Sequence, residues 1–272
     1  MNYKVLYRKY RPSTFEEIIG QENIVKILKS SIEEDKISHA YIFTGPRGTG
    51  KTSTAKVLAK ALNCENLNNG EPCGKCQNCL GFSTSPDIIE IDAASNNGVD
   101  EIRELRNNIT LAPSMSKYKV YIIDEVHMLS TGAFNALLKT LEEPPAHAIF
   151  ILATTEIYKV PITILSRCQR YDFKKIGKSD MVNYLKKVCK NEKIECDDNV
   201  LDEIYVLSDG CLRDALSILD QNSKSDSKIT LEELEKNYEL ISVAKIENLL
   251  NYIFTGNVNE IINILNEIEN TG

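Results

Sequence analysis

A glycine-rich stretch early in the chain has the spacing of a loop that binds phosphate groups. It fits the pattern G-x-x-x-x-G-K-(S/T) and consists of Gly45, Pro46, Arg47, Gly48, Thr49, Gly50, Lys51 and Thr52. Its glycines allow backbone N–H groups to turn toward anionic oxygens, and a helix that follows adds the positive end of its dipole. Lys51 can then reach the β- and γ-phosphates of a nucleotide, and the Thr52 hydroxyl can bind Mg²⁺. The alternative is an ordinary glycine turn, and the predicted strand before the loop and helix after it argue against that.

Two acidic residues follow an apolar run farther along the chain. The run predicts a strand at 118–125, which ends in Asp124 and Glu125. Asp124 would hold Mg²⁺, directly or through water, and Glu125 would polarise an attacking water. A strand that merely ends in polar residues is the alternative. Because this pair follows a phosphate-binding loop, we favour the functional interpretation.

Four cysteines in the segment 63–85 have the spacing of metal ligands. They are Cys64, Cys73, Cys76 and Cys79, in the pattern C-x8-C-x2-C-x2-C. Four thiolates without a nearby histidine predict a closed tetrahedral Zn²⁺ site, which would be structural because it has no open position. Reduced, unliganded cysteines on a loop are the alternative. The segment has few apolar residues and needs some tether, which favours zinc.

Alternating strands and helices must position these groups. Runs rich in apolar residues predict strands at 40–43, 87–92, 118–125 and 148–153, and a further short strand is expected at 169–173. Apolar residues at helical spacing predict helices at 21–35, 53–62, 99–109 and 130–143. The alternation is typical of a parallel α/β sheet whose ligands bind at the carboxyl ends of the strands.

Beyond this α/β region the strand pattern stops. Helices are predicted at 179–191, 197–208 and 212–221 and, after a polar linker at 222–228, at 243–254 and 258–269. We therefore expect an α/β domain at 1–176 with the cysteine segment (64–79) inserted, a three-helix domain at 177–241, and the first helices of another domain at 242–272.

The composition excludes several classes of protein. The chain has 272 residues, of which 42% are apolar and 26% charged, as in globular proteins. A net charge of −7 excludes a chain that is basic overall, although Lys4, Arg8, Lys9 and Arg11 form a local basic stretch. No apolar run approaches the ~18–20 residues of a membrane span, and the first residues lack the apolar core of a signal peptide. We expect a cytoplasmic protein with no membrane contact, whose eight cysteines serve a metal site or remain buried thiols.

Taken in order, these motifs resemble the γ/τ family of bacterial DNA polymerase III clamp-loader subunits, which are AAA+ ATPases. The resemblance covers essentially the whole chain. Besides the phosphate loop, the four cysteines and Asp124-Glu125, its marks are Tyr7-Arg8-Lys9-Tyr10-Arg11-Pro12, Leu141-Glu142-Glu143-Pro144-Pro145, Leu152-Ala153-Thr154-Thr155, Ser166-Arg167-Cys168 and Gly210-Cys211-Leu212-Arg213-Asp214-Ala215.

The resemblance implies a fold and a function. The fold is an AAA+ P-loop NTPase with a five-stranded parallel sheet, a helical lid and an all-α collar that forms a hetero-pentamer. The function is to bind and hydrolyse ATP with Mg²⁺ and to load the sliding clamp onto primer-template DNA during replication. In this family the third domain is longer than the segment after Ile241, so we expect only its first helices here.

The resemblance also assigns roles to single residues. Thr155 is expected to be sensor 1, Arg167 an arginine finger for the ATP of a neighbouring subunit, and Arg213 sensor 2. For Arg167 and Arg213 a plain ion pair is the alternative, with Asp214 a candidate partner of Arg213. The nucleotide contacts implied are the phosphate loop with Ser53 and, at the edge toward adenine, Arg8, Tyr10, Arg11 and Pro12. A packed N-terminal arm is an equal alternative for this last group.

Other interpretations remain at this point. A non-hydrolysing subunit of the same assembly would have a degraded phosphate loop, whereas this loop and Asp124-Glu125 are complete. A Holliday-junction motor, from another AAA+ class, is a further alternative. The four cysteines and Ser166-Arg167-Cys168 count against it. The family belongs to the DNA-directed DNA polymerase III holoenzyme, but no set of acids here would form a two-metal polymerase site. Residues 95–98 either open a helix that grips a DNA phosphate or form a plain N-cap.

Overall fold

The computed structural model describes residues 3–96, 98, 108–223, 228–238 and 243–269. The helix expected at 99–109 lies mostly outside the described residues. So do Asn97 of the possible DNA contact, most of the linker at 222–228, and the domain boundary expected at 241–242.

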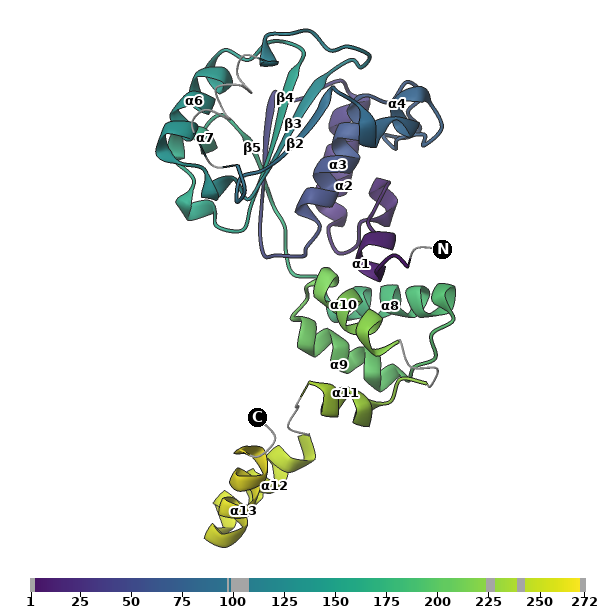
Figure 1. Ribbon diagram of the computed structural model, residues 1–272, viewed down its shortest axis with the longest axis vertical. Helices are drawn as coiled ribbons and strands as arrows, with labels where there is room; N and C mark the ends of the chain where they lie inside the picture. The colour runs from purple at the N-terminus through teal and green to yellow at the C-terminus, as the bar shows by residue number, and fades with distance from the viewer. Residues whose placement is uncertain (1–2, 97, 99–107, 224–227, 239–242, 270–272) are drawn as a thin grey trace.

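A five-stranded sheet forms the centre of the first half of the chain (Figure 1). Its strands are β1 (Ala40–Thr44), β2 (Ile88–Asp92), β3 (Lys119–Asp124), β4 (Ala148–Thr154) and β5 (Gln169–Asp172). Their order is β2-β3-β4-β1-β5, and every pair is parallel. All five predicted strands are present. The carboxyl ends of β1, β3 and β4 therefore meet at one edge, next to the phosphate loop.

Helices cover both faces of the sheet (Figure 1). α2 (Glu22–Glu33) and α3 (Lys51–Leu62) pack on one face, where Leu28 and Leu58 meet Ile122. α6 (Thr131–Glu142) and α7 (Ile162–Leu165) pack on the other, where Leu137 meets Ile123. Successive strand residues point to opposite faces. Because both faces are covered, the central strands β1, β3 and β4 are buried along almost their whole length, whereas the edge strands β2 and β5 are more exposed.

α6 shows how local sequence fixes an element that borders the site. The Ser130 hydroxyl accepts a hydrogen bond from the Ala133 N–H (3.2 Å), as expected for an N-cap. Pro144 and Pro145 follow its last residue and cannot continue the helix. The predicted helix at 130–143 is thus confirmed to within one residue at each end.

A separate cluster of helices follows the sheet (Figure 1). It contains α8 (Lys178–Glu192), α9 (Asp198–Ser208) and α10 (Leu212–Asn222), which confirms the three predicted helices. It also contains α11 (Leu231–Asn237), which the sequence analysis missed. α11 has only seven residues, too few for a clear periodic pattern. Thr230 caps its start by accepting from the Glu233 N–H, and Leu234 is fully buried.

Short elements and two further helices complete the fold. α1 (Leu6–Lys9) lies between the sheet region and the helical cluster and packs against α10 (Figure 1). Short 3₁₀ turns lie at Phe15–Glu17, Phe82–Thr84, Val126–Met128 and Ile157–Lys159, and α4 (Gln77–Leu80) lies in the cysteine segment. α12 (Val243–Thr255) and α13 (Val258–Glu269) lie as predicted and pack on each other. No helix of the described residues is both long and apolar enough to cross a membrane.

Candidate nucleotide-binding site and cysteine cluster

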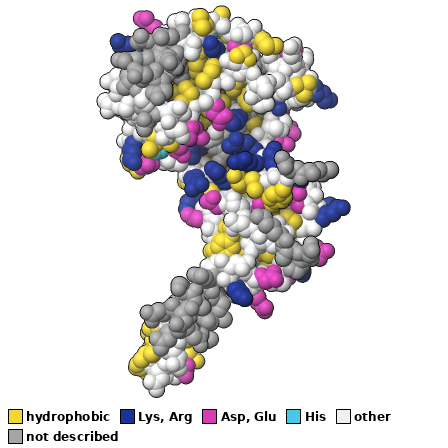
Figure 2. Space-filling model, in the orientation of Figure 1, with side chains coloured by type: hydrophobic (Ala, Val, Ile, Leu, Met, Phe, Trp, Pro, Cys, Tyr) yellow, Lys and Arg dark blue, Asp and Glu magenta, His cyan; other side chains and the backbone are white. Residues whose placement is uncertain are grey.

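A cavity of about 610 Å³ lies where the phosphate loop, the N-terminal arm (residues 3–12) and α10 meet. Its volume is within the range of small-molecule sites. Figure 2 shows Lys and Arg side chains gathered at this junction between the upper and lower parts of the molecule. The predicted residues that line the cavity are Arg8, Tyr10, Arg11, Pro12, Arg47, Gly48, Thr49, Gly50, Lys51, Thr52, Ser53, Asp124, Glu125 and Arg213. The structure therefore brings together residues that are more than 200 positions apart in the sequence.

Lys51 lies inside the loop with its side chain almost fully buried. Its Nζ donates to the carbonyl oxygens of Gly45 (2.9 Å) and Pro46 (2.8 Å). Burial lowers the pKa of the Lys51 ammonium, and the carboxylates of Glu125 and Asp124 act in the opposite direction. An ammonium that lines the cavity and is held on carbonyl oxygens is placed to exchange them for the phosphate oxygens of a ligand.

Thr52 and Asp124 form the hydroxyl–carboxylate pair that the sequence predicted. The Thr52 hydroxyl donates to Asp124 Oδ2 (2.8 Å), and Asp124 Oδ1 accepts from the Glu125 N–H (3.0 Å). Burial raises the pKa of Asp124, although the Thr52 hydrogen bond and the Lys51 ammonium oppose this. A hydroxyl and a carboxylate side by side, both partly buried, are oxygen ligands of the kind Mg²⁺ takes.

Glu125 is held toward the end of β4. Its carboxylate accepts from the backbone N–H (3.2 Å) and hydroxyl (3.0 Å) of Thr155. Its backbone has φ +47°, a left-handed conformation that costs a non-glycine residue about 1–3 kcal/mol. A backbone conformation with this much strain persists only when surrounding contacts hold it in place. The two hydrogen bonds from Thr155 are among those contacts. Thr155 lies outside the cavity lining, and the structure links it to Glu125.

His127 belongs to this group and was missed by the sequence analysis. Its side chain is only 6% exposed and contacts three groups. Nδ1 lies 3.0 Å from Thr154 Oγ1 and 3.4 Å from Glu125 Oε2, and Nε2 lies 3.2 Å from Glu156 Oε1. A histidine three residues after the Asp124 strand end carried no signal by type or spacing. Its position depends on β3 and β4 being neighbours, which the sequence does not state.

Arg213 reaches the cavity from the first turn of α10. Its guanidinium lies over the ring of Tyr7, with Cζ 5.1 Å from the ring centroid, and the Arg8 guanidinium lies 5.8 Å from the same centroid. Such contacts are worth about 0.5–1 kcal/mol at exposed sites. Tyr7 is a second residue that the sequence analysis did not assign to the site, although it stands in the quoted motif.

The arm that carries these residues is tied to the helical cluster. Lys9 Nζ and the Tyr10 hydroxyl both bind the carboxylate of Glu192, at the end of α8. Burial raises the pKa of Tyr10 to about 12, and the hydrogen bond to Glu192 adds to the shift. The phenol therefore stays protonated and keeps donating at neutral pH. Tyr10 is thus part of a packed arm and also lines the cavity, and its contact with the adenine edge of a nucleotide stays a prediction.

Arg167 lies outside the cavity lining, just after α7. Its guanidinium contacts Glu142 Oε1 (2.7 Å) through Nη2 and the Thr163 carbonyl (2.7 Å) through Nη1. Its side chain is about one-third exposed. Within one chain it forms the surface ion pair named as the alternative, and its role toward a neighbouring subunit stays a prediction.

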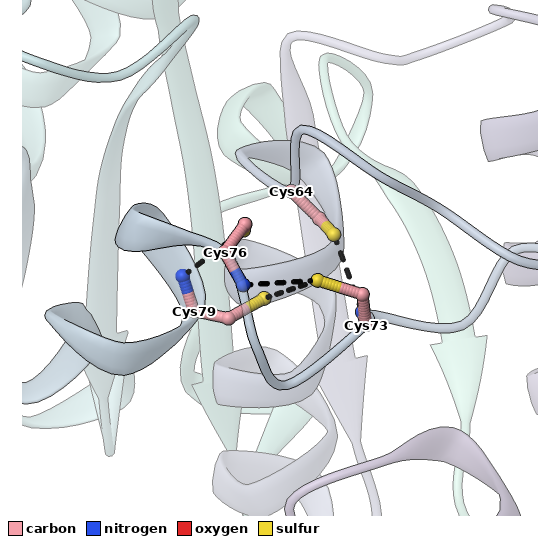
Figure 3. Close-up of side chains that lie close together, drawn as sticks. All are labelled: Cys64, Cys73, Cys76 and Cys79. Carbon is pink, nitrogen blue, oxygen red and sulfur yellow. Dashed lines mark hydrogen bonds between the residues drawn. The ribbon is translucent and has the colours of Figure 1, made fainter.

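The four cysteines converge in a cluster at α4 (Figure 3). All four sulfurs lie within 4.8 Å of one another, and the sulfurs of Cys73 and Cys79 are 3.9 Å apart. A tetrahedral Zn²⁺ with Zn–S bonds of about 2.3 Å has S–S edges of about 3.8 Å. Backbone N–H groups of Lys75 and Cys76 donate to Cys73 Sγ and lower the pKa of that thiol to about 6. The donor set and spacing fit a four-thiolate zinc site.

Comparisons with known proteins identify the family of the chain. A family model described as DNA polymerase III, delta subunit, matches residues 20–177. A second, described as DNA polymerase III clamp loader subunit, ATPase lid domain, matches residues 180–222. DNA polymerase III subunit tau of Bacillus subtilis is 56% identical over 216 residues, which are 79% of this chain and 38% of that protein. The tau subunit of Escherichia coli is 46% identical over 216 residues, 79% of this chain and 34% of that protein.

Among solved structures, the RuvB Holliday junction branch migration motor of Thermotoga maritima has a TM-score of 0.62 and 19% identity, covering 90% of this chain and 79% of that one. This likeness concerns the fold alone. The fold and the site together define a P-loop NTPase of the AAA+ class. Within that class, the family models and the relatives place the chain among the DNA polymerase III clamp-loader ATPase subunits, the family to which it belongs. The chain spans less than two-fifths of the length of the tau relatives.

Proposed function

We propose that this chain is an ATP-binding and ATP-hydrolysing motor subunit of a bacterial replicative clamp loader, which loads the sliding clamp onto primed DNA. One observation carries the proposal. Lys51, the Thr52–Asp124 pair and Arg213 converge on one cavity, although Arg213 comes from a different part of the chain. A nucleotide bound there would touch both the α/β region and the helical cluster, so its presence could change their relative position.

Each residue has a task at this site. Lys51 and the loop N–H groups hold the phosphates, and Thr52 with Asp124 holds the cation. Glu125 orients the attacking water, for which its carboxylate must leave Thr155. Arg8, Tyr10, Arg11 and Pro12 border the base, and Arg213 contacts the phosphates from α10. When bound, ATP with Mg²⁺ supplies the transferable phosphoryl group and a cation that neutralises its charge.

The proposal includes partners and domains. Arg167 is partly exposed and lies outside the cavity lining, which suits a group that acts on the nucleotide of a neighbouring clamp-loader subunit in a hetero-pentamer. The sliding clamp, primer-template DNA and a cytoplasmic location follow from the proposed role. We assign 1–176 to the ATPase domain, 177–241 to the lid and 242–272 to the start of a collar. The four-cysteine cluster holds a structural Zn²⁺.

Binding and turnover test the site separately. Lys51→Ala should abolish ATP binding in calorimetric titration, whereas Glu125→Gln should bind ATP without hydrolysing it. Lys56→Ala is the matched control, because Lys56 lies on the same helix but pairs with Glu90 (2.6 Å) outside the cavity lining. Unchanged affinity in Lys51→Ala would contradict the assignment of the loop.

The role in an assembly requires its partners. Turnover by the chain alone should be slow, and it should rise only when partner subunits, clamp and primed DNA are all present. In that assembly Arg167→Ala should lower turnover by about 10³-fold or more and leave the binding of ATP intact. Full-rate hydrolysis by a verified monomer would refute the action of Arg167 on a neighbour.

Metal content tests the cysteine cluster. Purified protein should contain one Zn²⁺ per chain, and chelation should make the four thiols of the cluster reactive. Less than stoichiometric zinc, with all four thiols freely reactive before chelation, would sink this assignment.

A further inference from the structure

Two cysteines outside the four-cysteine cluster also lie side by side. The sulfurs of Cys189 and Cys196 are 3.5 Å apart, at the turn between α8 and α9. Both are free thiols. Cys189 is only 6% exposed, whereas Cys196 is partly exposed. Cys196 is therefore the more accessible residue of the pair.

The backbone on both sides builds this proximity. α8 ends at Glu192, and Lys193 adopts a left-handed conformation with φ +58°. The N–H of Ile194 donates to the carbonyl of Cys189 (2.9 Å), so the chain turns back over the end of the helix. Cys196 is fixed from the other side, because it forms a parallel bridge with Ile229. The two sulfurs thus meet through a closed turn with hydrogen bonds at both ends.

The surroundings make the two thiols chemically unequal. The hydrogen bond between the two thiols lowers the pKa of Cys196, against burial and the nearby Asp197 and Asp198 carboxylates. The same hydrogen bond and burial raise the pKa of Cys189. Thiolate is the reactive form of cysteine. Cys196 is therefore both the more accessible and the more readily ionised thiol.

We propose that Cys189 and Cys196 form a redox-active dithiol that a hydroperoxide converts to an intramolecular disulfide. The Cys196 thiolate attacks the outer peroxide oxygen, which breaks the O–O bond and gives a sulfenic acid and the alkoxide of the hydroperoxide, which is hydroxide when the oxidant is hydrogen peroxide. The Cys189 sulfur then attacks the Cys196 sulfur and displaces its oxygen, which leaves as water with the Cys189 proton. The dithiol loses two electrons, and one hydroperoxide is reduced. The sulfurs need to approach by about 1.5 Å to reach the bond length of a disulfide, about 2.05 Å.

The Cys189–Cys196 pair lies at the end of α8, which also contacts the N-terminal arm. Glu192, in the same last turn of α8 as Cys189, binds Lys9 and Tyr10 of the N-terminal arm. A disulfide at this turn would fix the helix end that holds the arm. The proposal itself concerns the modification, and it stands or falls independently of the nucleotide site.

Peptide mapping of the zinc-loaded full chain tests it. Reduced protein is treated with hydrogen peroxide, quenched with catalase, alkylated and digested with trypsin. We expect the peptide 188–190 joined to 194–213, with a mass lower than the sum of the two by two hydrogen atoms. Dithiothreitol should release both. Since 194–213 also contains Cys211, the experiment is repeated with Cys211→Ser, in which the same link must form.

Variants separate the two steps. Cys189→Ser should stop at a sulfenic acid on Cys196, which dimedone traps, and Cys196→Ser should leave Cys189 unoxidised at the same dose. Cys168 is the internal control, because burial raises the pKa of this thiol to about 12. Its oxidation should be slower by about tenfold or more. Alkylation of both Cys189 and Cys196 at a peroxide dose that already oxidises Cys168 would overturn the proposal, as would a product that dithiothreitol does not reverse.

Discussion

Gly48 stands at a position of the phosphate loop where the motif accepts any residue, yet the structure requires glycine there. Its φ is +72°, in the left-handed region. A Cβ built on Gly48 would overlap the sulfur of Cys211, and it would lie 3.3 Å from the Cβ of Cys211 and 3.5 Å from that of Arg213. The backbone of the loop at Gly48 thus packs directly against side chains at the start of α10. We expect Gly48→Ala to push α10, and Arg213 with it, away from the cavity.

We expect α10 to move and the loop to stay in place, because hydrogen bonds fix the loop. The loop is fixed by Lys51, which donates to Gly45 and Pro46, and by the Thr49 hydroxyl, which donates to Pro46 (2.9 Å). An extra methyl group in a packed contact costs about 1–3 kcal/mol. If displacement of Arg213 removes that much from nucleotide binding, affinity falls by about 5- to 150-fold, since 1.4 kcal/mol is tenfold. The left-handed conformation adds about 1–2 kcal/mol of strain, which affects folding more than binding.

A double-mutant cycle measures this contact. Cys211→Ala leaves 3.3 Å between the two Cβ atoms, which is tight but tolerable. Titration with a fluorescent ATP analogue should give a weakened Gly48→Ala, a near-normal Cys211→Ala and a double variant restored to within a few-fold of the parent. Gly256→Ala is the matched control, because Gly256 has φ +70° and nothing within 4 Å of its built Cβ. Equal loss of affinity in Gly48→Ala and in the double variant would refute the reasoning.

Two further predictions concern buried charge and the stacked arginine. Burial alone would raise the pKa of Asp87, but hydrogen bonds from the N–H groups of Ser114, Met115 and Ser116 (2.8–3.0 Å) outweigh it and lower the pKa. The stabilisation is therefore present at neutral pH and lost as the pH falls through that lowered pKa. Asp87→Asn should lower the unfolding free energy at pH 7 by about 1–3 kcal/mol and weaken this acid dependence, measured by urea unfolding across pH. Arg213→Ala should weaken nucleotide affinity without changing the melting temperature of the apo protein by more than a few degrees, and Arg213→Lys should not restore affinity because an ammonium lacks the planar stacking group. Full rescue by lysine would show that charge alone matters there.

Sequence reasoning located the groups that form local patterns. The phosphate loop, Asp124-Glu125 and the four cysteines are such patterns, and all five strands were also located from the sequence. The sequence did not give the strand order, because an apolar run indicates that a strand is buried but not which strand lies next to it. More generally, it does not show which distant segments become neighbours, and His127 and Tyr7 were missed for this reason. Each acquires its contacts from a segment that folding brings close, the end of β4 for His127 and α10 for Tyr7.

The arrangement of the site separates binding from hydrolysis. Thr52 already donates to Asp124 at the end of β3, and Lys51 is held on the carbonyl oxygens of the loop. The two groups proposed for the chemical step are each engaged by another side chain, Glu125 by Thr155 at the cavity and Arg167 by Glu142 outside it. The Arg167–Glu142 pair is partly exposed, and pairs of this kind are worth only about 0–1 kcal/mol. A nucleotide bound to a neighbouring subunit could therefore replace Glu142 as the partner of Arg167 with little loss of stability. On the proposed roles, the residues of a single chain bind ATP, and hydrolysis requires contact with a neighbouring subunit, which brings Arg167 to the nucleotide.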